Sequence, residues 1–264
     1  MRPERPLDPE LHELSLSTGP LFHTDTGSGR PVIAAHGTPA TSRDFRWLDS
    51  ALEGRLRLIR LDLPGFGRTP ERTSRDQTLP ALGEVVVEAI EALGLEGAVV
   101  LGHSMGSVVA LEAAAASERV AGLALVNGSG PMFHRGTFPR TYRVIERVVD
   151  LHPLARRATA GVLLPVARLA GYSKRLSEAE QVWALRLCAR QDPARFERTM
   201  RALDKPVLVA WAEDDPSVEP KVSRALIACV NDPEVVRFAK GGHNLQASQA
   251  VELADALVRW SASL

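Results

Sequence analysis

A potential nucleophile stands in the pattern GHSMG at positions 102–106, where Ser104 lies between two glycines. An apolar run precedes this pattern and a run of small residues with helical character follows it. A nucleophile elbow places its serine on a strained turn between a strand and a helix, which requires small neighbours where the two backbones approach. A strand-to-helix turn with a capping serine is the alternative. Because of its context, we interpret Ser104 as a nucleophile.

A serine hydroxyl is a poor nucleophile until a base removes its proton, so a histidine is required. Of the seven histidines, His243 follows the last expected strand, in the sequence GGH at 241–243. We select His243 as the base, because its loop position and the flexibility of the two glycines suit delivery to the serine. His103 is excluded as the base, since a residue adjacent to Ser104 in a strained turn directs its side chain elsewhere.

The histidine in turn needs a carboxylate that fixes its tautomer and stabilises the imidazolium. The segment WAEDD at 211–215 follows an expected strand and offers Asp214 and Asp215. We favour Asp215, with Asp214 as the alternative, and one of the two is also expected to cap the following helix. The end of the strand at 120–127 is another conceivable place for the acid, but Asn127 stands there.

An acyl-transfer reaction also needs backbone N–H groups that hold the developing oxyanion. One donor is expected at Met105, directly after the nucleophile, and the other at Thr38 in the sequence HGTP at 36–39. A simple turn would also explain HGTP. Taken together, these residues predict acyl transfer through a covalent acyl-enzyme, which requires no metal and no organic cofactor.

The elements that must position these residues are visible as apolar runs of strand length that alternate with segments of helical length. Such runs are typical of strands covered on both faces. The alternation predicts an α/β fold with a mostly parallel, doubly wound sheet of about eight strands, including an N-terminal hairpin. The expected strands after the hairpin are 32–37, 56–65, 98–104, 120–128, 205–213 and 234–239, and the expected helices are 42–53, 78–94, 105–117, 217–230 and 244–262.

Residues 131–200 break this alternation, since they contain only helical patterns interrupted by proline and glycine. We therefore predict an α/β core from residues 1–130 and 201–264, with 131–200 inserted as a helical cap. The cap carries 13 Lys and Arg against 6 Asp and Glu, which is usually a solvated face. The alternative is that it attracts an anionic substrate. Apolar cap residues that we expect to line the acyl pocket are Met132, Phe133, Phe138 and Trp183.

Five motifs occur in a fixed order along the chain, namely HGTP (36–39), DLPGFGRT (62–69), GHSMGS (102–107), WAEDD (211–215) and GGH (241–243). This series resembles the α/β-hydrolase superfamily over about residues 20–262, apart from the cap. In pattern it is most similar to capped esterases, lactonases, C–C bond hydrolases, proline iminopeptidases and cofactor-free haloperoxidases. The resemblance implies that DLPGFGRT is a structural loop near the site, with Phe66 a candidate pocket residue. Superfamily members that dehalogenate haloalkanes or open epoxides carry an aspartate nucleophile, and Ser104 argues against both.

The composition and the N-terminal sequence indicate which partners and which location to expect. Lys plus Arg and Asp plus Glu both total 32, so no bulk attraction to nucleic acid or to a membrane is expected. The N-terminus lacks the apolar stretch of a signal peptide, which predicts a cytoplasmic enzyme.

We expect the protein to cleave an ester or related acyl bond of a small molecule. C–C bond hydrolysis, perhydrolysis and acyl transfer or cyclisation on the same residues remain open, as does a slow-turnover ligand receptor. Substrate identity and oligomeric state are not readable from the sequence.

Overall fold

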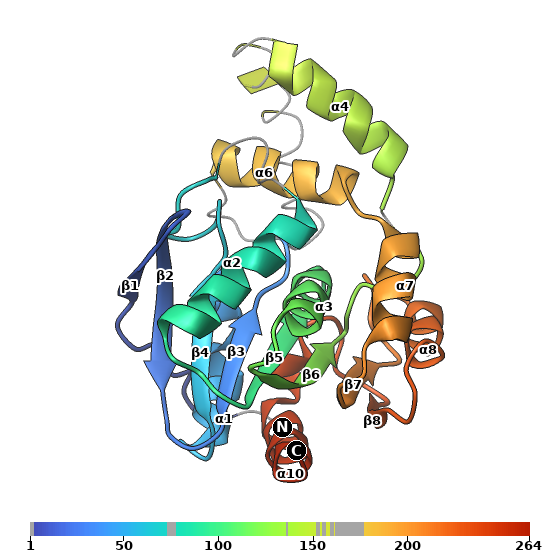
Figure 1. Ribbon diagram of the computed structural model, residues 1–264. Coiled ribbons are helices and arrows are strands. Elements are labelled where there is room, and N and C mark those ends of the chain that lie inside the picture. Colours follow the sequence, from blue (N-terminus) through green and yellow to red (C-terminus); the bar gives the residue numbers. More distant parts are fainter. Residues whose placement is uncertain are drawn as a thin grey trace.

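An eight-stranded sheet forms the centre of the molecule, and helices cover both of its faces (Figure 1). The computed structural model describes residues 3–72, 78–135, 137–151, 154, 157–158, 161 and 177–264. The strands are β1 (His12–Leu16), β2 (Gly19–Thr26), β3 (Pro31–Ala35), β4 (Arg57–Asp62), β5 (Ala98–His103), β6 (Val120–Val126), β7 (Val207–Ala212) and β8 (Glu234–Phe238). Their order in the sheet is β1-β2-β4-β3-β5-β6-β7-β8.

The sheet is mixed, because β1 pairs antiparallel with β2 and β2 pairs antiparallel with β4. All other neighbours are parallel. The expected fold class is therefore confirmed, and the expected N-terminal hairpin is the antiparallel part. Strand β3 pairs with β4 on one side and with β5 on the other, so the chain reverses its direction of winding there. In open α/β sheets, ligands bind at the carboxyl ends of the strands beside such a switch point.

The helices follow the expected alternation closely. They are the 3₁₀ helix η1 (Ser42–Phe45) and the α-helices α1 (Arg46–Leu52), α2 (Leu79–Ala92), α3 (Gly106–Ala116), α4 (Pro139–Leu151), α6 (Glu178–Ala189), α7 (Pro193–Ala202), α8 (Pro220–Ile227), α9 (Leu245–Ser248) and α10 (Ala250–Ser261). The single helix expected over 244–262 is interrupted at Gln249, where φ is −125° and ψ is 37°. Thr78 caps α2, its side chain accepting a hydrogen bond from the backbone of Ala81, as expected for a helix that begins at this point.

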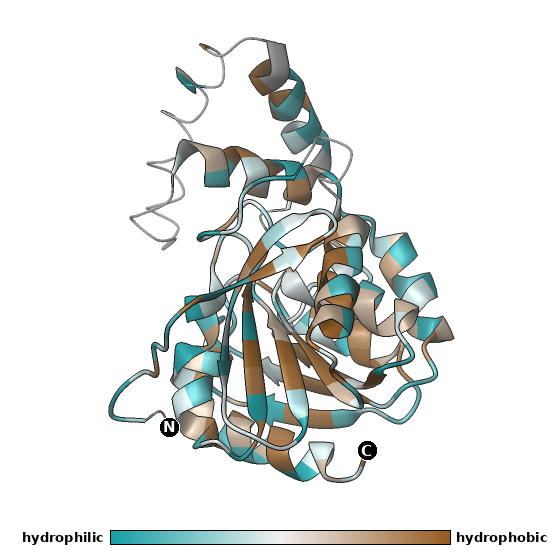
Figure 2. Ribbon diagram, turned by 60° about the vertical axis from the view of Figure 1, so that its left-hand side comes forward, coloured by the Kyte–Doolittle hydropathy of each residue, from teal (hydrophilic) through white to brown (hydrophobic). Residues whose placement is uncertain are grey.

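Alternate residues of each central strand supply two separate hydrophobic clusters, one on each face. In β3, Ile33 joins the cluster formed with α2 and α3, whereas Val32 joins the cluster formed with α1 and α10. This arrangement explains why the strand sequences are apolar throughout rather than alternating. Figure 2 shows the same distribution, with hydrophobic strands at the centre and hydrophilic stretches on outward-facing parts of the helices.

Within the described part of residues 131–200 there are helices and no strand. Helices α4 and α6 lie together at one end of the molecule, far from α10 (Figure 1). Trp183 of α6 and Phe196 and Met200 of α7 contribute to the hydrophobic cluster on the α2–α3 face, so this part of the segment packs against the body. That 131–200 forms a distinct cap stays a prediction. Among the described residues, no helix combines the length and apolarity required to cross a membrane.

Candidate active site

Ser104 occupies the turn between β5 and α3 with φ at +53°, in the left-handed region that non-glycine residues rarely adopt. The two glycines of the pattern allow this turn to form. A Cβ at Gly102 would lie 2.5 Å from the carbonyl oxygen of Gly106, and a Cβ at Gly106 would lie 2.2 Å from that of Ala35. Both distances are shorter than real Cβ contacts permit, so the strand and helix backbones meet only because side chains are missing. The turn therefore has the conformation of a nucleophile elbow.

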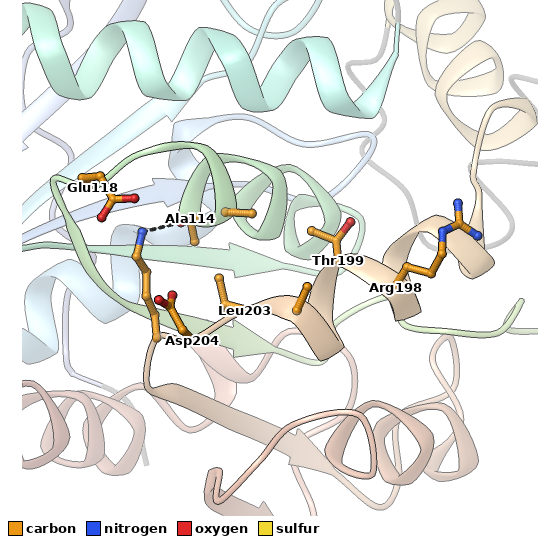
Figure 3. Close-up of a pocket in the computed structure, with 9 residues that line it drawn as sticks. Ala114, Glu118, Arg198, Thr199, Leu203 and Asp204 are labelled. Carbon is orange, nitrogen blue, oxygen red and sulfur yellow. Dashed lines mark hydrogen bonds between the residues drawn. The ribbon is translucent and has the colours of Figure 1, made fainter.

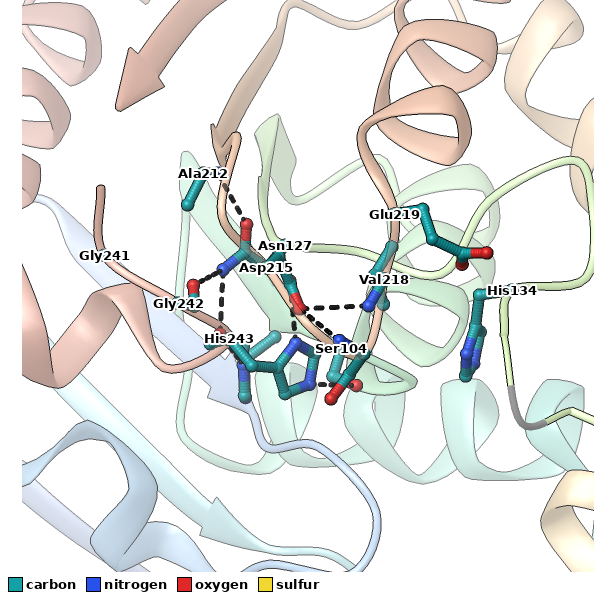
Figure 4. A network of polar contacts seen from close by, with 12 residues as sticks. Ser104, Asn127, His134, Ala212, Asp215, Val218, Glu219, Gly241, Gly242 and His243 are labelled. Carbon is teal, nitrogen blue, oxygen red and sulfur yellow. Dashed lines mark hydrogen bonds and ion pairs between the residues drawn. The ribbon is translucent and has the colours of Figure 1, made fainter. Parts of the chain in front are cut away.

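Three loops at the carboxyl edge of the sheet bring Ser104, His243 and Asp215 together (Figure 4). The Nε2 atom of His243 lies 3.0 Å from Oγ of Ser104, and its Nδ1 lies 2.8 Å from Oδ2 of Asp215. Since a carboxylate only accepts hydrogen bonds, Nδ1 carries the proton and Nε2 presents its lone pair to the serine hydroxyl. We call this arrangement the Ser–His–Asp chain. It is the geometry that proton removal from the serine requires.

Burial lowers the pKa of His243 below its ordinary value, and the hydrogen bond to Asp215 opposes that effect. A lowered pKa keeps the imidazole neutral near neutral pH, which is the state that can accept a proton. Asp215 is itself buried, with 1% of its side chain exposed against 19% for His243.

The two neighbouring aspartates have different partners. Besides His243, Asp215 accepts hydrogen bonds at Oδ1 from the backbone N–H groups of Ser217 (2.7 Å) and Val218 (3.0 Å). Asp214 is exposed and directs its Oδ1 to the N–H groups of Gly241 and Gly242, at 2.8 Å each. Of the two candidates, it is therefore Asp215 that the structure brings to the histidine.

The loops that carry Thr38 and Met105 lie side by side, because β3 pairs with β5 and Ala35 is opposite Gly102. A Cβ at Gly37 would lie 3.1 Å from Cβ of Ser104. Within the described residues, neither the N–H of Thr38 nor that of Met105 donates a backbone hydrogen bond. The structure thus places the loop that holds Thr38 beside the turn that holds Ser104 and Met105. Binding of an oxyanion by these two N–H groups stays a prediction.

His36 fixes the loop after β3. Its Nδ1 donates to the carbonyl of Gly37 at 2.7 Å, and its Nε2 accepts the N–H of Leu63 at 3.0 Å. Burial lowers the pKa of His36, in keeping with this neutral tautomer. The ring of Phe66 meets it edge-on, with centroids 5.4 Å apart. His36 therefore links the loop that holds Thr38 to the loop that follows β4.

Asn127 has a structural role that the sequence did not indicate. At φ +43°, it donates through Nδ2 to the carbonyls of Gly242 and His243, at 2.8 Å each. Its Oδ1 accepts the N–H of Ala212 at 2.9 Å. The side chain therefore ties the end of β6 to β7 and to the histidine loop. Its position at a strand end was the only available signal, and it indicated merely that no acid is present.

The expected pocket residues have different environments. Phe66 and Trp183 are 1% and 0% exposed, and the indole lies against Gly65, where a Cβ would approach it to 2.6 Å. Packing thus places both rings in the core. Phe138 is 60% exposed, whereas Met132 and Phe133 line a groove of about 850 Å³ beside α4, α6 and α7. Contact of any of these five residues with a substrate stays a prediction.

A smaller depression of about 360 Å³ lies beside α3 and α7, lined by Glu118, Arg198 and Asp204 among others (Figure 3). Lys205, which also lines it, donates through Nζ to the carbonyls of Ala114 and Ser117, at 2.7 and 2.6 Å. This lysine therefore supports the C-terminal end of α3. Neither this depression nor the larger groove is lined by a member of the Ser–His–Asp chain.

Comparison with known proteins identifies the family. Residues 32–256 match the Alpha/beta hydrolase family. The chain belongs to this family. Haloalkane dehalogenase 2 of Mycobacterium tuberculosis is 24% identical, over 95% of this chain and 96% of that protein. The putative carbamate hydrolase RutD of Azorhizobium caulinodans is 27% identical, over 86% of this chain and 89% of that protein. The esterase EaEST of Exiguobacterium antarcticum has a similar fold, with a TM-score of 0.76 at 20% identity over 95% of this chain and 98% of that one.

Proposed function

We propose that this member of the alpha/beta hydrolase family is a serine hydrolase that cleaves an ester or related acyl bond of a small molecule. The observation that carries the proposal is the 3.0 Å contact between Oγ of Ser104 and Nε2 of His243, on a serine held at φ +53°. The contact of Asp215 with the far side of the imidazole adds support, since it fixes the tautomer that can accept a proton.

In the proposed reaction, Oγ of Ser104 attacks the substrate carbonyl carbon as its proton passes to Nε2 of His243. The new imidazolium is stabilised by Asp215, and the N–H groups of Thr38 and Met105 bind the oxyanion. His243 then gives the proton to the leaving group as the scissile bond breaks. Water, activated by the same histidine, attacks the acyl-enzyme and releases the acid and the free serine.

The arginines of 131–200 bear on the hypothesis of an anionic substrate. Among the described residues, three of them are engaged in ion pairs, Arg135 with Glu219 at 4.0 Å, Arg190 with Glu146 at 2.6 Å and Arg195 with Glu112 at 2.7 Å. Arg140 and Arg147 of α4 are exposed and are the better candidates for attracting an anion. We include charged and neutral esters in the test for this reason.

The test is a panel of activated esters of varied chain length and charge, lactones and amino-acyl amides, assayed with the wild type and with Ser104→Ala. We expect the variant to lose turnover and labelling by a serine-reactive phosphonate together, because both need Oγ. The matched control is Ser129→Ala. The Ser129 hydroxyl is buried and has no hydrogen-bond partner among the described residues, so activity and labelling should persist.

Turnover retained by a correctly folded Ser104→Ala protein would refute the mechanism. Cleavage of C–C bonds, or transfer of the acyl group to alcohols or peroxide, would redirect the proposal to another reaction of the same serine. Tight ligand binding without multiple turnover would instead favour a receptor.

A further inference from the structure

A second histidine–carboxylate pair lies directly behind the Ser–His–Asp chain, and the proposed acyl chemistry does not use it. Nδ1 of His103 lies 2.7 Å from Oδ2 of Asp44, and Nε2 of His103 lies 3.0 Å from the carbonyl oxygen of His243. Nε2 of Gln246 donates to the other oxygen of Asp44 at 2.9 Å. The groups come from η1, the end of β5, α9 and the histidine loop, so four separate segments converge here.

The hydrogen-bond partners determine how many protons His103 carries. A carbonyl oxygen only accepts, so Nε2 of His103 must bear a proton to bond to His243. Nδ1 has two neighbours, an oxygen of Asp44 at 2.7 Å, which also accepts, and Nε2 of Gln246 at 3.1 Å. The Gln246 amide donates to the other oxygen of Asp44, so the shorter contact with the carboxylate decides, and Nδ1 bears a proton as well. A neutral ring with its proton on Nε2 would place two lone pairs 2.7 Å apart. The contacts therefore fit an imidazolium that is 3% exposed and paired with a carboxylate.

The electrostatic balance agrees with this assignment. Burial works against a charge on His103, but Asp44, the carbonyl of His243 and Asp215 together outweigh it and raise the pKa of the imidazole, with Asp44 the largest of the three. Burial likewise disfavours the Asp44 anion, yet His103 holds the pKa of that carboxyl down at about 2. Each group is thus charged because the other is.

We propose that His103 and Asp44 act as a positioning pair for the catalytic base: the pair anchors the backbone of His243 and places a positive charge beside its ring. The proposal rests on the proposed function, in which His243 is that base. The two imidazole rings are 4.9 Å apart between centroids and tilted by 47°. A cation at that distance repels a second proton and so keeps His243 free to accept one from the serine.

Other titratable groups face the two histidines and must be included in the balance. Asp215 contacts His243 from the loop after β7 and raises its pKa, and Asp44 of η1 acts on it in the same direction at longer range. His36, from the loop after β3, is neutral and buried. Among these groups, His103 is the one that lowers the pKa of His243 by its charge.

The proposal predicts how the acid limb of the pH profile of kcat/KM shifts when the pair is changed. Protonated His243 cannot act as a base, so kcat/KM falls as the pH drops through the pKa of His243. In His103→Gln the cation is lost and the Asp44 anion remains, so the pKa of His243 rises. We expect the limb to move to higher pH by about one unit. In the double variant His103→Gln/Asp44→Asn both charges are lost, and the limb should return most of the way to that of the wild type.

A control variant and an independent measurement separate this role from a merely structural one. His23→Gln removes a buried histidine from β2, which β4 and β3 separate from β5, and should leave the limb in place. The second measurement needs no activity: nitrogen-15 NMR of the histidine-labelled wild type should show both ring nitrogens of His103 protonated at pH 8. The signal is assigned by its loss in the double variant.

A uniform loss of kcat in His103→Gln with an unmoved acid limb would overturn the proposal. An NMR signal that shows His103 neutral at pH 8 would also overturn the proposal, irrespective of which substrates the protein hydrolyses. Failure of the proposed function is recognised separately, since it would leave the wild type without ester turnover while the NMR result stands. Poor folding of His103→Gln, with Asp44 buried and unpaired, leaves the NMR experiment to decide.

Discussion

Replacing Asp215 by Asn should inactivate the enzyme without unfolding it, because the geometry of the site dictates which way the amide will face. The Oδ1 position of Asp215 accepts two backbone N–H groups, from Ser217 and Val218. The carbonyl oxygen of an Asn would keep that position, since an NH₂ group there would meet two donors. Its NH₂ group then faces Nδ1 of His243 in the place of Oδ2.

An amide donor at that position forces Nδ1 to accept, so the proton of a neutral imidazole moves to Nε2. Nε2 then faces Ser104 as a donor and cannot remove the hydroxyl proton. Loss of the correct tautomer in a serine–histidine–aspartate site costs about 10⁴-fold in kcat, which corresponds to about 5.4 kcal/mol at 1.36 kcal/mol per tenfold. We expect a kcat loss of that order with little change in KM.

The neighbouring variant Asp214→Asn is the matched control. The Asn oxygen can still accept the N–H groups of Gly241 and Gly242, so only the charge is lost. A charge-assisted bond is about twice as strong as a neutral one, and we expect kcat to fall by less than about tenfold. The assay is steady-state hydrolysis of an activated ester at pH 8, with thermal unfolding of each variant. A larger kcat loss in Asp214→Asn than in Asp215→Asn would refute the reasoning.

Two further predictions concern the framework of the site. Gly106→Ala places a Cβ 2.2 Å from the carbonyl oxygen of Ala35, so the free energy of unfolding should fall by about 1–3 kcal/mol and ester turnover should fall with it; an unchanged denaturation midpoint in urea would contradict this. Asp49→Ala leaves the guanidinium of Arg60, which is 1% exposed and 3.1 Å from Asp49, buried without its carboxylate, and should cost about 3–5 kcal/mol. The exposed pair of Glu96 with Arg119 serves as the control, where Glu96→Ala should cost less than about 1 kcal/mol.

The features predictable from the sequence are those encoded locally. The nucleophile elbow needs its glycines at fixed distances from Ser104, so the pattern and its flanking strand and helix appear together within one short segment. The central strands are apolar on both faces because two clusters need them, and this too is a local pattern. Strand β8 gave a weak signal because none of its five residues is fully buried and two of them are charged.

Side chains that depend on long-range contacts could not be predicted. Asp44 and His103 are 59 positions apart, and Gln246 is 143 positions from His103. Nothing in the sequence near Asp44 distinguishes a buried partner of histidine from an acidic residue in the first turn of a helix. The sequence leaves Asp214 as an alternative to Asp215 for a related reason. Adjacent residues of one turn point in different directions, and only the folded loop shows which one points inward.

Aromatic residues in the segment 131–200 present the same difficulty. A large apolar side chain can fill the core or line a pocket, and its type does not tell which. Trp183 fills the core because Gly65, at φ +84°, leaves room for the indole against the loop after β4. Phe138, equally apolar, is mostly exposed. The difference lies in what each ring meets in the fold.

The glycine pair before His243 has a different role from the one that the sequence suggested. The flexibility of the two glycines was one reason for selecting His243 as the base, yet the backbone here is tightly held. The N–H groups of Gly241 and Gly242 bind Asp214, and the carbonyl of His243 accepts from both Asn127 and His103. Gly242 has a φ of +62°, which favours glycine, and a Cβ at Gly241 would lie 2.4 Å from Cδ2 of Leu245, a buried side chain that would have to move. The backbone of His243, the proposed base, is thus held in place, so in the proposed reaction its ring is positioned without reorganisation. Changes to Asp214, Asn127 or His103 should therefore act on kcat, although none of these side chains belongs to the Ser–His–Asp chain.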